Sequence, residues 1–314
     1  MSWIARFKKH GPNGFGYAST AQEVTEGLDL SGKTYLLTGC SAGLGLETWR
    51  VLTMRGAHVI ATARNREKAL RVAREVAVAD PFVLACDLSE PASVAQCVAK
   101  VREHGHTLDG IIANAGIMAV PKLEQKYGYE LQFFTNHVGH FLLVTQLLEA
   151  LSERARVVVV SSDAHRRAPR GGIQFDNLSG SGGYHPWLAY GQSKLANLLF
   201  AKQLAKHFEG SAKTANAVHP GVIATDLHQH LPEFARRLMS GLQPLLLKNV
   251  EQGAATQCFV VAHPGAEGLN GEYLKDCRVA QPSTKAQDAA LAARLWEVSE
   301  EIAEKLQRSV SLAA

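Results

Sequence analysis

The sequence predicts an α/β domain in which a doubly wound parallel sheet carries helices on both faces. Short apolar runs rich in Val and Ile alternate with longer helical stretches along most of the 314 residues. Most of these runs are continuously apolar, which is typical of strands buried on both faces. The alternation of strand and helix favours right-handed crossover connections. Because no linker or internal repeat divides the chain, we expect a single domain.

Each element of this pattern can be placed along the chain. The predicted strands are 34–38, 58–63, 82–86, 110–113, 156–161 and 214–218. The predicted helices lie near 44–55, 65–79, 90–104, 122–151, 188–209 and 286–307. We expect residues 1–31 to form an extended N-terminal arm, 32–282 the α/β domain, and 283–314 a C-terminal helix packed on it.

Two segments interrupt the alternation, 163–187 and 222–250. The second has apolar residues close to helical spacing, namely Leu227, Leu231, Phe234, Leu238 and Leu242. This apolar face either packs in the core or belongs to a mobile lid over a site. Both segments should flank the carboxyl ends of the strands, where ligands bind in sheets of this type.

Composition argues against several classes of protein. The net charge is +4, and the Lys and Arg residues are scattered, which argues against nucleic-acid binding. No apolar stretch is long enough to span a bilayer, and the first ten residues lack the apolar core of a secretory signal, so membrane association is not expected. The five cysteines are far apart and form no CxxC motif, which fits a reducing, cytoplasmic location.

The thirteen histidines raise the question of a metal site. Their close pairs are His104/His106, His228/His230 and His137/His140. The first two pairs are spaced i and i+2 and would diverge on a helix, and no carboxylate or cysteine completes a ligand set nearby. The sequence therefore predicts no metal site.

A glycine-rich loop follows the first strand and opens the first long helix. Gly39, Gly43 and Gly45 give the spacing Gly-x-x-x-Gly-x-Gly. Glycines let the backbone approach a pyrophosphate, and a helix N-terminus offers free N–H groups and a partial positive charge. A strand before the loop and a helix after it favour a dinucleotide site over a purely structural turn.

The end of the second strand indicates which dinucleotide would bind. An acidic residue there would accept hydrogen bonds from the adenosine ribose and repel a 2′-phosphate, but this chain has Arg64 instead. A guanidinium suits a phosphate group. We therefore expect NADP(H) to be preferred over NAD(H), unless Arg64 is simply a surface residue in an exposed turn.

Tyr190 and Lys194 lie four residues apart, so on a helix they share one face. A cation near a phenol favours the phenolate and lowers a pKa that is about 10 when unperturbed. Such a tyrosine could exchange a proton with an alcohol or a carbonyl. The pair alone is weak evidence, because Tyr-x-x-x-Lys also arises on solvated helix faces.

Several ordered motifs carry a family resemblance over about residues 29–273. After the glycine loop come Asp87-Leu88, Asn114-Ala115-Gly116, Asn136, Ser161-Ser162, Tyr190-x-x-x-Lys194 and Pro220-Gly221. Together they resemble the short-chain dehydrogenase/reductase family, which implies a Rossmann-type catalytic domain. Within it, the stretches 29–33, 136–141, 190–197 and 219–222 look most like the retinol dehydrogenase and WW-domain oxidoreductase branch, without a WW domain. Plant protochlorophyllide reductases share parts of this pattern.

The resemblance implies a catalytic set and a cofactor site. Tyr190 would be the general acid or base, Lys194 would bind the nicotinamide ribose, and Ser162 would donate to the substrate oxygen. Asn136 would hold a water that relays protons. Ser161 is less suited than Ser162, since alternate residues of a strand face opposite ways. The expected cofactor contacts are Gly39, Ser41, Gly43, Leu44, Gly45, Arg64, Asn65, Asp87, Leu88, Asn114, Ala115, Gly116, Tyr190, Lys194, Pro220, Gly221, Val222 and Thr225.

We therefore expect an NADP(H)-dependent oxidoreductase that interconverts a hydrophobic alcohol and its ketone or aldehyde. Trp187 and Met118, with the apolar face of 222–250, suggest the hydrophobic substrate. The alternative is a noncatalytic NADP-binding regulatory or interaction protein on the same fold. The resemblance allows a homodimer through helices 122–151 and 188–209, and equally a monomer.

Overall fold

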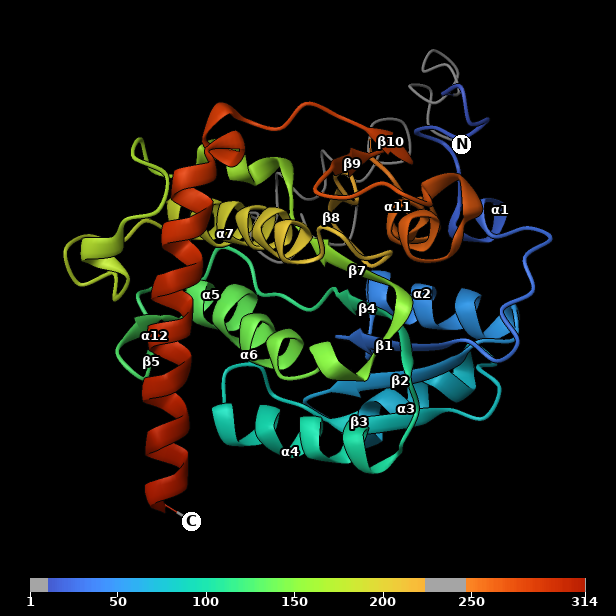
Figure 1. The fold of residues 1–314 in the computed structure, drawn as a ribbon, viewed down its shortest axis with the longest axis horizontal. Helices are drawn as coiled ribbons and strands as arrows, with labels where there is room; N and C mark the ends of the chain where they lie inside the picture. Colours follow the sequence, from blue (N-terminus) through green and yellow to red (C-terminus); the bar gives the residue numbers. More distant parts are fainter. Residues whose placement is uncertain (1–10, 224–246, 314) are drawn as a thin grey trace, which may run out of the picture.

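The computed structural model describes residues 11–223 and 247–313. Its main strands are β1 (Thr34–Thr38), β2 (His58–Ala63), β3 (Phe82–Ala85), β4 (Leu108–Ala113), β7 (Leu151–Val160), β8 (Thr214–His219), β9 (Tyr273–Lys275) and β10 (Arg278–Val279). They form one sheet in the order β10-β9-β8-β7-β4-β1-β2-β3, and only β9 and β10 pair antiparallel. The predicted fold class, a single α/β domain with a doubly wound sheet, is confirmed (Figure 1).

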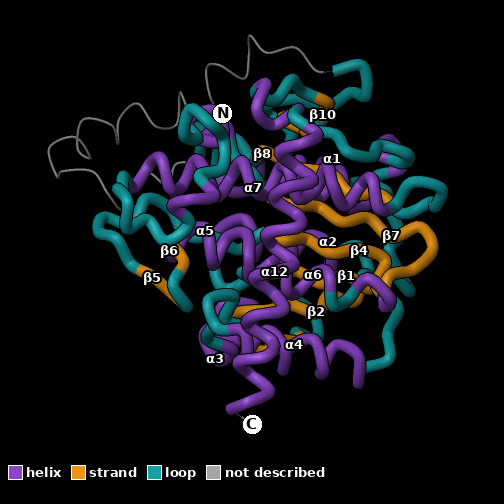
Figure 2. Tube along the Cα trace, turned by 60° about the vertical axis from the view of Figure 1, so that its left-hand side comes forward, coloured by secondary structure: helices purple, strands orange, loops and turns teal. Residues whose placement is uncertain are grey.

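Helices cover both faces of this sheet (Figure 2). The main helices are α1 (Ala21–Val24), α2 (Gly43–Met54), α3 (Arg66–Glu75), α4 (Pro91–Glu103), α6 (Gly139–Thr145), α7 (Pro186–His207), α11 (Val250–Ala262) and α12 (Ala289–Ala313). One apolar cluster joins the sheet to α4, α6, α7 and α12, and a second joins it to α1, α2, α3 and α11. Every residue of β1 and β8 is buried, which explains why these strands read as continuous runs rather than alternating ones.

The predicted helix 122–151 is wrong over its first part, whereas residues 131–145 are helical. Residues Gln125–Lys126 (β5) and Tyr129–Glu130 (β6) instead form a small hairpin. Tyr127 and Gly128 both have positive φ, 52° and 85°, as a two-residue hairpin turn requires. Helical structure begins only after Glu130, whose carboxylate accepts from the N–H groups of the next turn at Gln132 and Phe133.

This helical stretch is itself irregular. A short α5 (Leu131–Phe133) passes into a π-helix, Phe134–Val138, before α6 begins. A 3₁₀ turn at Leu148–Ala150 then leads directly into β7. Because a π-turn shifts the backbone bonding by one residue, it is often found where a helix presents a functional group. Asn136 lies within it.

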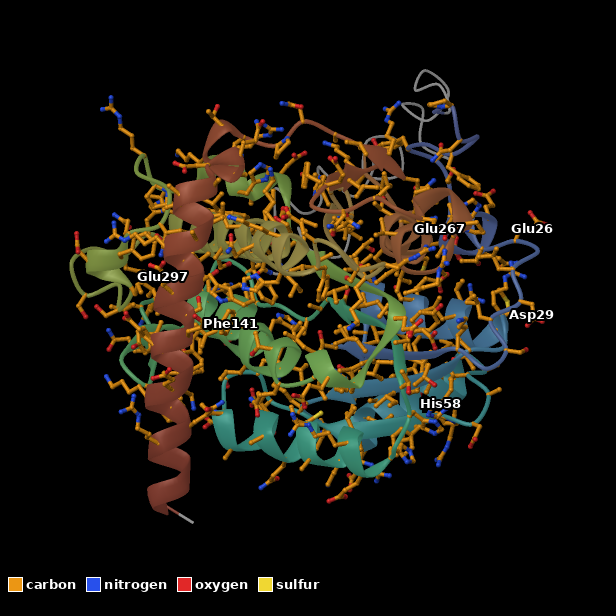
Figure 3. All side chains as sticks on the ribbon, in the orientation of Figure 1. Glu26, Asp29, His58, Phe141, Glu267 and Glu297 are labelled. Atoms are coloured by element: carbon orange, nitrogen blue, oxygen red, sulfur yellow. The ribbon has the colours of Figure 1, made fainter. Side chains whose placement is uncertain are left out.

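Several elements outside the predicted alternation were not expected from the sequence, whereas the C-terminal helix was. Helix α11 and the β9–β10 hairpin were not expected, and residues 11–31, expected to be extended, contain α1 and pack on α11 through the buried Ala21 and Val24. At the C-terminus, α12 packs across α7 and α6, close to Phe141 (Figure 3). The Trp296 ring of α12 meets that of Phe141 edge to face, with centroids 5.0 Å apart. Among the described residues, no helix is both long and apolar enough to cross a membrane.

Candidate active site

Tyr190 and Lys194 lie one turn apart in α7, at the edge where the parallel strands end. Lys194 Nζ is 5.8 Å from the centroid of the Tyr190 ring. The lysine side chain is buried, at 4% exposure, and its ammonium donates to the carbonyl of Val160, the last residue of β7, at 3.0 Å. Tyr190 is only partly buried. The cation is thus fixed by the strand end while the tyrosine remains accessible.

Asn136 is held rigidly between the loop after β4 and helix α7. Its Oδ1 accepts from the Ile117 N–H at 2.8 Å, and its Nδ2 donates to the Ile117 carbonyl at 2.9 Å. Nδ2 also donates to Ser193 Oγ at 2.9 Å, and that hydroxyl in turn donates to the Tyr190 carbonyl at 2.8 Å. Ser193, which sequence reasoning missed, therefore links Asn136 to the backbone of the tyrosine.

The loop after β4 lies against this pair of side chains. A Cβ on Gly116 would lie 3.2 Å from Asn136 Oδ1 and 3.4 Å from Lys194 Nζ. Gly116, Asn136 and Lys194 therefore surround one point, and the absence of a side chain at Gly116 keeps that point open. The structure thus brings together three residues that lie on separate motifs of the sequence.

The two serines after β7 face opposite ways, as the alternation of strand residues predicts. Ser161 is 1% exposed, and its hydroxyl donates to the Lys194 carbonyl at 2.7 Å. Ser162 is half-buried, and its hydroxyl accepts from the Ala164 N–H at 3.2 Å. Ser161 therefore secures α7 to the sheet, and Ser162 is the serine with access to a ligand.

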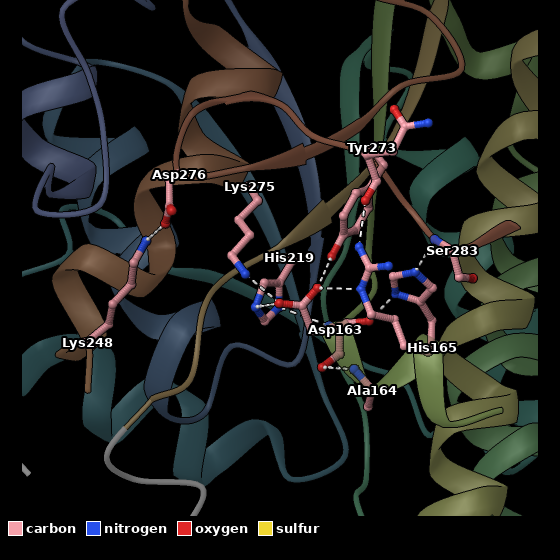
Figure 4. A network of polar contacts seen from close by, with 12 residues as sticks. Asp163, Ala164, His165, His219, Lys248, Tyr273, Lys275, Asp276 and Ser283 are labelled. Atoms are coloured by element: carbon pink, nitrogen blue, oxygen red, sulfur yellow. Dashed lines mark hydrogen bonds and ion pairs between the residues drawn. The ribbon is translucent and has the colours of Figure 1, made fainter. Parts of the chain in front are cut away.

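A polar network centred on Asp163 supports the segment that carries Ser162 (Figure 4). The Asp163 carboxylate accepts from Tyr273 Oη at 3.1 Å and contacts Lys275 and His219, the last with Nε2 at 3.2 Å. Its own N–H donates to Nδ1 of His219 at 3.3 Å. The hydrogen bond from His219, with that from Lys275, holds the pKa of Asp163 well below its usual range.

His165 holds the turn after β7 in place through hydrogen bonds at both ring nitrogens. It is buried, its Nδ1 pairs with the Ser162 carbonyl at 2.6 Å, and its Nε2 accepts from the Ser283 N–H at 3.0 Å. Burial lowers the pKa of this imidazole. His165 therefore fixes the turn after β7 to the chain before α12.

The glycine loop joins β1 to α2. Gly39 and Gly43 have φ of +76° and +54°, which favour glycine. A Cβ on Gly45 would lie 2.2 Å from the Gly39 carbonyl, so only glycine allows the loop to turn this tightly. The residue that precedes α2, Ala42, supplies no side-chain cap to the helix N-terminus. The N–H groups of that first turn, which include those of Leu44 and Gly45, can therefore serve an anion.

Thr38, the last residue of β1, connects this loop to the rest of the site. Its Oγ1 accepts from the N–H groups of Asn114 and Ala115, both at 2.9 Å, and donates to His140 Nε2 at 2.9 Å. His140 uses its other ring nitrogen to donate to the Asn136 carbonyl at 2.9 Å. Neither Thr38 nor His140 was assigned a role from the sequence.

The histidines His137 and His140, considered as a metal pair, diverge. His137 Nε2 reaches Ser299 Oγ at 2.8 Å on α12, whereas His140 faces Thr38. Burial lowers the pKa of His137 to about 3 and that of His140 to about 4, so both rings are neutral.

The remaining expected cofactor residues lie along the same edge. Arg64 is exposed at the end of β2, while the Asn65 side chain caps α3 by accepting from the Lys68 N–H at 2.8 Å. After β3, Asp87 Oδ1 accepts from the N–H and hydroxyl of Ser89, and Leu88 is buried. The geometry thus leaves Arg64 available for a ligand and gives Asn65 a local structural partner.

In the segment after β8, the structure describes only residues 220–223 and those from 247 onward. Pro220 is buried, Gly221 has φ +96°, and Val222 is 52% exposed. Ile223 bridges to Lys248 in parallel, and the Val222 carbonyl accepts from the Lys248 N–H at 3.0 Å. Thr225 and the predicted apolar face, Leu227, Leu231, Phe234, Leu238 and Leu242, lie outside the described residues.

Lys248, which pairs with the segment after β8, also forms a buried ion pair with Asp276. Its Nζ lies 2.7 Å from Asp276 Oδ1, and the two side chains are 1% and 4% exposed. Asp276 and Cys277 form the β9–β10 turn with φ of 55° and 58°, values unusual for residues other than glycine. The ammonium also lies 5.0 Å from the centroid of the Tyr17 ring.

Comparison with known proteins identifies the family. A family model described as short chain dehydrogenase matches residues 33–235. Short-chain dehydrogenase TIC 32 B, chloroplastic, of Brassica napus is 40% identical over 312 residues, covering 95% of this chain and 97% of its own length. Human retinol dehydrogenase 14 is 35% identical over 322 residues, covering 95% and 93%.

Solved structures agree with this assignment. The crystal structure of an uncharacterized protein from Mycobacterium paratuberculosis is 32% identical, with a TM-score of 0.73 over 90% of this chain and 97% of that one. A short-chain dehydrogenase from Burkholderia cenocepacia, solved in complex with NADP, is 25% identical, with a TM-score of 0.61 over 78% and 96%. The chain therefore belongs to the short-chain dehydrogenase family of oxidoreductases.

Proposed function

We propose that this protein is an NADP(H)-dependent oxidoreductase that interconverts a hydrophobic alcohol and its ketone or aldehyde. The observation that carries the proposal is the convergence of Lys194 and Asn136 on Gly116, beside Tyr190 and the half-buried Ser162. These groups come from two loops, the π-helix and α7 at the carboxyl edge of the sheet, which is where ligands bind in doubly wound folds.

The glycine loop fits a dinucleotide. Gly39 and Gly45 pack the loop tightly against Asn114 and the backbone of the loop itself, and the N-terminus of α2 has no side-chain cap. The pyrophosphate would be held by the backbone around Ser41, Gly43 and Leu44. When bound, the nicotinamide supplies or accepts the hydride. Exposed Arg64 would pair with a 2′-phosphate, which supports NADP(H) over NAD(H).

The side chains at the carboxyl edge of the sheet would transfer a proton to or from the substrate oxygen and stabilise the charge that develops on it. In reduction of a carbonyl, Tyr190 Oη would donate a proton to the substrate oxygen, and in oxidation it would accept the proton of the alcohol. Ser162 Oγ would donate a hydrogen bond to the same oxygen and stabilise its developing charge. The charge of Lys194 would favour the phenolate, and Asn136 would position a water for proton exchange with solvent.

Exposed apolar side chains support a hydrophobic substrate. Trp187, Leu188 and Val222 are 39%, 44% and 52% exposed, and they flank the site on α7 and after β8. The Trp187 ring lies 6.3 Å from that of Tyr190, edge to face. Several relatives are named retinol dehydrogenase, and retinol is itself a hydrophobic alcohol.

Replacement of the tyrosine tests the proposal. Tyr190→Phe should abolish most NADPH-dependent reduction across a panel of hydrophobic aldehydes and ketones, while NADPH binding, followed by cofactor fluorescence, persists. The matched control is Tyr127→Phe on the β5–β6 hairpin, where the phenol is 47% exposed and bonds Glu90. Turnover by Tyr190→Phe close to wild type would exclude the assigned role. NADPH binding without turnover by the wild-type protein would favour the noncatalytic alternative.

A further inference from the structure

Three histidines gather at the edge of the sheet where the parallel strands begin. His58 is the first residue of β2, His104 follows the last residue of α4, and His106 precedes β4. One ring nitrogen from each can be chosen so that all three lie within 4.8 Å of one another. Figure 3 labels His58 at this edge. The cluster is therefore separate from the glycine loop and Tyr190, which lie at the carboxyl ends of the strands.

The local backbone explains how distant residues meet. Helix α4 ends at Glu103, and Gly105 follows with φ +67°, a conformation that glycine adopts readily. Because the helix has ended, the i and i+2 spacing of His104 and His106 does not separate their rings, whose centroids lie 5.2 Å apart. The His58 ring lies 6.1 Å from His104 and 5.2 Å from His106.

Within the part of the chain that the structure describes, one ring nitrogen of this cluster is buried without a hydrogen bond. Among the described residues, Nε2 of His58 is enclosed and has no hydrogen-bond partner. Enclosed polar atoms are normally paired, so this unpartnered nitrogen, in a ring that lies beside two other imidazoles, is a candidate metal ligand. His104 and His106 are exposed, which leaves their rings free to turn toward it. Phe82 supports this arrangement, since its ring lies 4.3 Å from that of His104.

The surroundings of His58 favour its neutral imidazole. Burial lowers the pKa of His58, and the neighbouring His106 and His104 lower it further, whereas Asp80 opposes them. The neutral imidazole is the form that binds a metal.

We propose that His58, His104 and His106 form a binding site for a divalent transition metal ion, with Zn²⁺ as the ion to test. Three imidazole ligands suit Zn²⁺, which binds histidine nitrogen at about 2.0–2.1 Å and leaves a fourth position for water. Tetrahedral ligands at that distance are about 3.4 Å apart. Small rotations of the two exposed rings would bring the nitrogens from within 4.8 Å to that spacing.

The metal would join segments that are far apart in the sequence. It would link the start of β2 to the connection between α4 and β4. An ion that binds only the folded chain raises its stability in proportion to the logarithm of the ion concentration. The site lies at the opposite edge from Tyr190, so we expect Zn²⁺ at this site to raise thermal stability and leave turnover unchanged.

Equilibrium dialysis of the untagged, chelator-treated full chain tests the proposal. The wild-type protein should bind one strong Zn²⁺ at pH 7.5. Its melting temperature should rise by roughly 5 °C at a hundredfold excess over the dissociation constant. The double variant His104→Gln, His106→Gln should lose both effects; both residues are exposed, so the fold should persist.

The control is a second His-x-His pair in the same chain. The double variant His228→Gln, His230→Gln has the same spacing and removes the same number of imidazoles. It should bind Zn²⁺ as the wild type does. Strong binding that persists in the His104/His106 variant, or is lost in the His228/His230 variant, would overturn the assignment. The absence of any binding at 100-fold molar excess of Zn²⁺ over protein would also overturn it.

Discussion

The buried histidine His137 should make the protein markedly less stable in mild acid. It is 1% exposed among Phe133, Phe141 and Phe200, and burial lowers its pKa from the ordinary 6.5 to about 3. Between pH 7.5 and 5.0 the unfolded chain therefore takes up a proton at this position, and the folded chain does not. Stability rises with pH wherever the unfolded state binds more protons, so it must fall as the pH drops through 6.5.

The size of the effect follows from the two pKa values. Proton uptake by the unfolded chain alone lowers the free energy of unfolding by about 2 kcal/mol between pH 7.5 and 5.0. His140, whose pKa burial lowers to about 4, contributes about 2 kcal/mol more over the same interval. The carboxylate of Asp163 adds little here, because its lowered pKa makes its contribution disappear only below about pH 4.

Urea unfolding at the two pH values measures this directly. In His137→Gln the amide can still donate to Ser299, and the loss of stability between pH 7.5 and 5.0 should be smaller than in wild type by about 2 kcal/mol. His207→Gln, at an exposed position, should keep the wild-type loss. If His137→Gln showed the same pH dependence as wild type, the buried neutral state of His137 would be refuted.

Three further changes test other parts of the structure. Ser162→Ala should lower kcat about 100-fold if Ser162 stabilises the substrate oxygen, whereas Ser161→Ala should mainly reduce thermal stability; equal kcat losses would contradict the distinction. Arg64→Ser should raise KM for NADPH about tenfold and spare KM for NADH, since a charged hydrogen bond is lost; an unchanged ratio would exclude a 2′-phosphate contact. Asp276→Asn should destabilise the fold by about 3–5 kcal/mol by leaving Lys248 charged and buried, and an unchanged melting temperature would argue against that.

The central fold could be predicted because its strands depend on local pattern. The predicted spans 34–38 and 58–63 coincide with β1 and β2. The prediction failed at 122–151, where a hairpin turn at Tyr127-Gly128 and the capping carboxylate of Glu130 decide the structure. The β9–β10 hairpin is too short to stand out in sequence, and its turn relies on a distant ion pair.

Sequence reasoning could predict the geometry of the site only where the residues concerned lie on the same helix or at the end of the same strand. The spacing of Tyr190 and Lys194 and the alternation of Ser161 and Ser162 are local rules, and the geometry follows both. Contacts between residues on different helices and strands leave no such pattern in the sequence. The Thr38–His140 hydrogen bond, for example, joins residues 102 positions apart.

The pairing of Ile223 with Lys248 bears on how the length of the connection between them can change. Ile223 and Lys248 are held together by a backbone pair, and a buried ion pair with Asp276 fixes Lys248 in addition. Changing the length of a connection whose ends are fixed costs little free energy. The length of the connection between these two residues can therefore change at little cost in stability.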